Sequence, residues 1–157
     1  MEDKDFDIEQ AYNELKQKHN LPEFTKLAQD FDIEKIQESI FLTREIRRAI
    51  NEKITAYIHL FENLINPNTP PMFIFSILRN ISTKDKDTIK EIYKTLSKTK
   101  IETIKLDTIY NETSEVKFIN DIFNTWQSIK PKIHKLIENF ETNFETDDTS
   151  KKRSYFG

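Results

Sequence analysis

Two long segments of the chain carry mainly hydrophobic residues at alternating spacings of three and four. In the first segment, about 33–65, these positions are Ile33, Ile36, Ile40, Thr43, Arg47, Ile50, Ile54, Tyr57, Phe61 and Leu64. In the second segment, about 115–144, they are Ile119, Ile122, Trp126, Ile129, Ile133, Leu136 and Phe140. This spacing places side chains on one face of an α-helix, as in coiled coils. It therefore predicts two long heptad-patterned helices.

Shorter patterns around these two segments predict further helices. The tetrapeptide Phe-Asp-Ile-Glu occurs at 6–9 and again at 31–34. Each copy is typical of a helix start, because an Asp side chain accepts hydrogen bonds from the unpaired amides of the first turn. The segment 72–81 is apolar nearly all round and predicts a short buried helix.

Helix boundaries in the second half of the chain depend on capping residues. Ser82 or Thr83 is expected to cap a helix that follows, and Ser114 is expected to cap the last one. Between them, residues 101–107 are rich in β-branched side chains, so a strand is an alternative there. We interpret the segment as helix.

Glycine content decides the fold class. The chain contains one Gly, at position 157. Tight β-hairpins and phosphate-binding loops depend on Gly, which excludes Rossmann and P-loop nucleotide-binding folds. We predict an all-α protein, an elongated antiparallel helical bundle forming a single domain over 1–144. Residues 145–157 are predicted to be a disordered C-terminal tail.

Composition restricts the cellular setting. The net charge is −3. The chain contains no Cys, which excludes disulfides and thiolate metal sites. The longest apolar run, at 72–75, is far shorter than the ~18 residues of a membrane span. Three of the first five residues are acidic, unlike an export signal. We therefore expect a cytoplasmic, intracellular protein without a membrane partner.

Catalytic and metal-binding motifs are missing from the sequence. The histidines are His19, His59 and His134, and none belongs to a Glu-x-x-His pair or a His-Glu-x-x-His motif. Acid–base catalysis usually relies on a positioned His beside an acid or a nucleophile. We expect no metal, no cofactor, no small-molecule substrate and no enzymatic activity.

Arginine is concentrated at one place. Three of the five arginines are Arg44, Arg47 and Arg48, called here the arginine cluster. Guanidinium groups bind carboxylates and phosphates with two parallel hydrogen bonds, so the cluster is a candidate partner- or anion-binding site. The alternative is an internal ion-pair network that fixes the helix register. Its candidate acidic partners are Glu38, Glu45 and Glu52.

Lysine recurs every fourth residue along the helix predicted after residue 83. The lysine ridge consists of Lys86, Lys90, Lys94 and Lys98. Such a basic stripe can track the phosphates of a nucleic acid. The alternative is an ordinary solvated helix face.

Heptad patterns form equally well within one chain and between two chains. We therefore predict a helical protein–protein interaction module, a subunit or adaptor of a larger assembly. Its partners would be other protein chains, or a second copy in a homodimer. Trp126, on the second heptad pattern, is predicted to be a buried core residue, with an interface anchor as the alternative. The alternative function is a nucleic-acid-associated protein that uses the arginine cluster and the lysine ridge.

Overall fold

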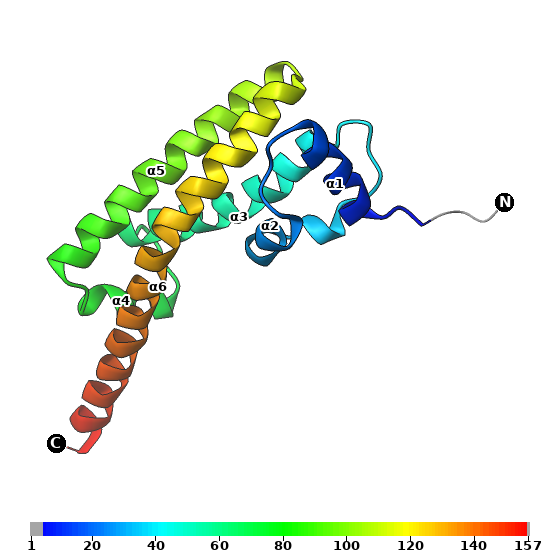
Figure 1. Cartoon of the computed structure of the whole chain (residues 1–157). Helices are drawn as coiled ribbons and strands as arrows, with labels where there is room; N and C mark the ends of the chain where they lie inside the picture. Colours follow the sequence, from blue (N-terminus) through cyan, green and yellow to red (C-terminus); the bar gives the residue numbers. More distant parts are fainter. Residues whose placement is uncertain (1–4, 157) are drawn as a thin grey trace. The chain divides into compact units, whose positions relative to one another are not determined.

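The computed structural model describes residues 5–156, and the side chains of residues 5–146. In this part of the chain there are six α-helices, one short 3-10 helix and no strand (Figure 1). The predicted all-α class is confirmed. The elements are α1 (Ile8–Lys18), α2 (Phe24–Asp30), η1 (Ile33–Lys35), α3 (Leu42–Ile65), α4 (Met72–Arg79), α5 (Thr83–Thr108) and α6 (Glu112–Phe156).

The chain divides into two compact units, each built from segments that are distant in the sequence. Unit 1 comprises 1–56 and 98–126, and unit 2 comprises 57–97 and 127–157. Segments of α3, α5 and α6 contribute to both units. The predicted single domain over 1–144 stays a prediction.

The heptad positions form much of the core of each unit. In unit 1 the buried ones are Ile33, Arg47, Ile50, Ile54, Thr43, Ile119, Ile122 and Trp126. In unit 2 they are Phe61, Leu64, Ile129, Ile133, Leu136 and Phe140. Trp126 is buried as predicted, with its ring centroid 5.7 Å from that of Phe31. The heptad spacing thus identified the buried faces of α3 and α6 correctly.

The first long helix begins later than the heptad pattern predicts. α3 starts at Leu42, whereas Ile33 lies in η1 and Ile36 adopts an extended backbone. Ile33 is fully buried without a continuing helix, while Ile40 is 89% exposed. The apolar side chain at position 40 therefore gains no burial that would stabilise helix over 36–41.

Capping residues explain where α1, α5 and α6 begin. The Asp7 carboxylate accepts a hydrogen bond from the amide of Gln10 (3.1 Å), and the Ser82 hydroxyl accepts one from the amide of Asp85 (3.0 Å). The cap of α6 is Asn111, whose side chain accepts from the amide of Ser114 (2.9 Å). The predicted cap at Ser114 is therefore wrong. Because Asn111 precedes Ser114 and its side chain accepts from an amide of the first turn, the helix begins at Glu112.

Two segments of the second half, 101–107 and 145–156, belong to helices of the structure. Residues 101–107 belong to α5, which confirms helix over strand. α6 continues past the predicted end near residue 144, to Phe156. The predicted disorder of 145–157 stays a prediction, because the side chains of 147–157 lie outside the described residues. Among the described helices, none is both long and apolar enough to cross a membrane.

Candidate functional site

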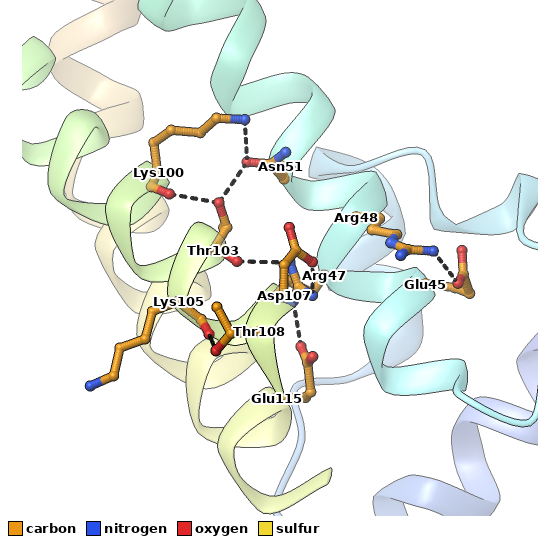
Figure 2. A network of polar contacts seen from close by, with 10 residues as sticks. All are labelled: Glu45, Arg47, Arg48, Asn51, Lys100, Thr103, Lys105, Asp107, Thr108 and Glu115. Carbon is orange, nitrogen blue, oxygen red and sulfur yellow. Dashed lines mark hydrogen bonds and ion pairs between the residues drawn. The ribbon is translucent and has the colours of Figure 1, made fainter. Parts of the chain in front are cut away.

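The arginine cluster is centred on one buried side chain of unit 1. Arg47 projects from α3 and is 1% exposed. Its Nε donates to Glu115 Oε2 of α6 (2.5 Å), and its Nη2 donates to Asp107 Oδ1 of α5 (2.7 Å) (Figure 2). Its Nη1 donates to the carbonyl of Thr103 (3.4 Å). One guanidinium group thus joins segments of three helices.

A second set of polar contacts lies beside this group (Figure 2). The Thr103 hydroxyl donates to the carbonyl of Lys100 (2.7 Å) and contacts Asn51 Oδ1 (3.3 Å). Lys100 Nζ donates to the same Asn51 oxygen (3.2 Å) and to the Thr55 hydroxyl (3.1 Å). These bonds satisfy polar side chains between α3 and α5 that would be costly to bury alone.

Electrostatic coupling keeps the network charged. Burial acts to lower the pKa of Arg47, but hydrogen bonds with Glu115 and Asp107 more than compensate, so this pKa lies above its ordinary value. The hydrogen bond from Arg47 holds the pKa of Asp107 below its ordinary value. The positive charges of Arg47, Arg48 and Arg44 lower it further. Arg47 and Asp107 therefore remain an ion pair at neutral pH.

We expect the contribution of Asp107 to stability to depend on pH. Because its pKa is lower in the folded chain than in the unfolded chain, its stabilising effect is present above about pH 4 and is lost as the pH falls below that value. Asp107 is half exposed, so the effect is roughly 0.5–1 kcal/mol after allowance for solvent screening. The measurement is urea unfolding of the wild type and of Asp107→Asn at pH 7 and at about pH 2.5, which is below the usual pKa of a carboxyl group.

The matched control is Asp32→Asn, because Asp32 is exposed and, among the described residues, pairs only with Lys35 (3.5 Å). The difference between the wild type and Asp107→Asn should shrink from pH 7 to pH 2.5, a range that spans the usual Asp pKa of about 3.9. A difference of the same size at both pH values would contradict the assigned ion pair.

The other two arginines are held at the surface of the same unit. The Arg44 guanidinium stacks on the rings of Phe41 (5.3 Å) and Tyr110 (5.0 Å). The Tyr110 hydroxyl is hydrogen-bonded to that of Thr43 (3.0 Å). Arg48 is exposed and pairs with Glu45 one turn away (2.9 Å).

The cluster therefore has the internal partners that the structural interpretation requires, although not all of those named from the sequence. Glu45 is a partner, but Glu38 and Glu52 make no ion pair with any described residue. Asp107 and Glu115 were missed, because sequence spacing carries no signal for a contact between helices. Arg47 pairs with Asp107 and Glu115 and is shielded from solvent, and Arg48 pairs with Glu45. Arg44 contacts aromatic rings instead. Binding of an external anion or partner by the cluster stays a prediction.

The lysine ridge is exposed along α5. None of the side chains of Lys86, Lys90, Lys94 and Lys98 makes an ion pair or hydrogen bond with another described residue. Lys86 and Lys90 line a groove of about 320 Å³ in unit 2. The remaining lining residues are Leu64, Ile65, Pro67, Leu78 and Ile89. Two exposed lysines, called here the rim, and five apolar residues, called here the floor, thus line one groove.

Helix α4 of unit 2 exposes large apolar side chains. Ile74 and Ile77 are buried, as the sequence predicted for the whole segment, but Met72, Phe73 and Phe75 are 73%, 52% and 45% exposed. The prediction of a fully buried helix is therefore wrong. Ile74 and Ile77 pack into the unit, whereas Met72 and Phe75, which share a face three residues apart, and Phe73 remain in solvent.

A second exposed apolar group lies in unit 1. It consists of Ile101 and Ile104 on α5, and Ile109 just after the helix, which are all well over half exposed. Residues three apart on a helix are surface neighbours. Ile101 and Ile104 therefore form one apolar strip on the outer face of α5.

Each of the three histidines contacts a Glu side chain. His19 contacts Glu112 (2.7 Å), His59 contacts Glu62 (3.4 Å) and His134 contacts Glu138 (3.3 Å). Across the described residues, no group of three or more His, Cys, Asp or Glu side chains is arranged to hold a metal ion.

No protein-family model matches the chain, and no curated protein or solved structure is similar enough to count as a relative.

Proposed function

We propose that this chain is a helical protein–protein interaction module, a subunit or adaptor of a larger assembly. The observation that carries the proposal is the exposure of large apolar side chains on α4: Met72 and Phe75, which are three residues apart and share one face, and Phe73 next to Met72 in sequence. Full burial of one such side chain contributes about 1.5–3 kcal/mol to stability. These three side chains gain only part of that within their own unit, because they remain partly exposed. Contiguous exposed apolar side chains are typical of surfaces that another protein covers.

The heptad positions support α4 rather than α3 or α6 as the binding element. Ile50, Ile54, Phe61 and Leu64 of α3 are buried within the chain, as are Ile119 through Phe140 at the heptad positions of α6. A coiled-coil dimer formed through these positions would have to open the core of each unit. A partner, including a second copy, is instead expected on the exposed face of α4.

A second candidate function is association with nucleic acid through the lysine ridge. The exposed and unpaired lysines of α5 favour it, because such cations release counterions from phosphates. The arginine cluster gives it little support, since Arg47 is buried and Arg48 is paired with Glu45.

Co-purification from the cells that make the protein tests the first proposal. The tagged wild type is expected to retain a defined partner protein, or a second differently tagged copy. The double variant Phe73→Ser/Phe75→Ser should retain about 90% less of this partner than the wild type does, because truncating central aromatic side chains removes most of the interface energy. Phe144→Ser is the matched control, since Phe144 is an equally exposed aromatic side chain of unit 2 outside α4.

Equal retention by all three proteins, or retention of nothing above background, would contradict the proposal. Retention that disappears on nuclease treatment or in moderate salt would instead favour the nucleic-acid function. Circular dichroism of each variant checks that the helices are intact.

A further inference from the structure

The groove lined by Lys86 and Lys90 combines two features that together indicate a ligand class. Its floor comes from the end of α3 (Leu64, Ile65), the loop after it (Pro67), α4 (Leu78) and α5 (Ile89). At about 320 Å³ it lies at the small end of ligand-sized cavities. It therefore suits one or two apolar side chains presented by a larger molecule.

The rim of the groove is positively charged and unpaired. Lys86 and Lys90 are one helical turn apart, both exposed, and neither side chain contacts a carboxylate among the described residues. Asp87, which lies between them in sequence, is not part of the lining. Carboxylates of a bound molecule would meet two free ammonium groups there.

We propose that this groove binds an acidic amphipathic segment of a partner protein. An apolar side chain of the segment enters the groove, and flanking Asp or Glu side chains pair with Lys86 and Lys90. The inference rests on the proposed function and specifies the chemistry of the partner. Charge complementarity across an interface selects the partner and speeds the encounter.

Two other occupants fit the groove less well. The chain's own C-terminal residues 151–153, Lys-Lys-Arg, carry the same charge sign as the rim. Nucleic acid would pair its phosphates with the lysines, but the lining contains no aromatic or Arg side chain on which a base stacks. The apolar floor is of use only to a ligand with apolar side chains.

Selection from a library of random dodecapeptides displayed on phage, with the full-length chain immobilised, tests the proposal. The selected peptides are expected to combine Asp or Glu with Phe, Leu or Trp. Lys86→Glu/Lys90→Glu should weaken a selected synthetic peptide about ten-fold or more, because reversing rim charges creates repulsion. Ile65→Ser, which removes part of the apolar floor, should weaken it about five-fold or more.

The matched control is Lys98→Glu/Lys105→Glu, which reverses two exposed lysines of the same helix outside the groove. This control should change the affinity by less than about two-fold. Basic or uncharged consensus peptides, an equal loss in both double variants, or no enrichment would each overturn the proposal. So would a single-stranded RNA or DNA oligonucleotide that displaces the peptide, or self-association that only the groove variant abolishes.

These outcomes are separable from the test of α4. If no acidic, apolar peptide is selected while Phe73→Ser/Phe75→Ser still loses its partner, the groove proposal is wrong and the proposed function stands. If the peptide binds as expected but co-purification is unchanged in that variant, the groove is a site and α4 is not.

Discussion

Replacing Arg47 by Ala is expected to lower the free energy of unfolding by about 3–5 kcal/mol. Arg47 is 1% exposed and is the cation for Glu115, which is itself fully buried. Without the guanidinium, the Glu115 carboxylate would remain in the core with no cation, and the carbonyl of Thr103 would lose a donor. Urea unfolding followed by circular dichroism measures the change.

The matched control for this prediction is Arg48→Ala. Arg48 is the next residue of α3, is half exposed and pairs with Glu45 at the surface. Its removal should change the free energy of unfolding by less than about 1 kcal/mol. If Arg47→Ala and Arg48→Ala unfold alike, the buried network does not stabilise unit 1 and the arginine cluster would need another role.

Trp126→Ala is the second large effect, a loss of about 3–5 kcal/mol, as large-to-small substitutions in a core cause. Trp126 is 3% exposed and packs near Phe31, and the Lys53 ammonium lies 5.4 Å from its ring. The cavity left by the indole would lie beside Phe31, between α2 and η1, and Lys53 of α3. Urea unfolding of the variant measures the loss.

Phe144→Ala serves as its control, because this aromatic side chain is half exposed and should cost less than about 1 kcal/mol. Trp126 is the single Trp of the chain, so native fluorescence reports on it directly. An emission spectrum of the folded protein typical of a fully hydrated indole would contradict its burial.

Periodicity along one helix was readable from the sequence. The buried faces of α3 and α6 follow from the spacing of Ile50, Ile54, Ile122 and Ile129, because a helix repeats every 3.6 residues whatever it packs against. The absence of internal Gly likewise predicted helices throughout, since strands need turns that this chain cannot readily make.

Contacts between helices were not readable in this way. Arg47 and Glu115 are 68 residues apart, and nothing in either local sequence specifies the other. The exposure of Met72, Phe73 and Phe75 on α4 was not readable either. The sequence shows that these side chains are apolar, but it does not show whether another segment of their unit covers them. The late start of α3 has the same origin, since Ile40 fits the heptad spacing and yet has no surface to pack on.

Site-specific photo-crosslinking tests most directly whether another protein chain covers the exposed face of α4. A photoreactive amino acid replaces Phe73 in the full-length chain, in living cells, and the same group replaces exposed Glu141 of α6 as a control. We expect one discrete crosslinked protein, or a crosslinked second copy, from position 73 and none from position 141. No crosslink from position 73, or the same diffuse products from both positions, would contradict it.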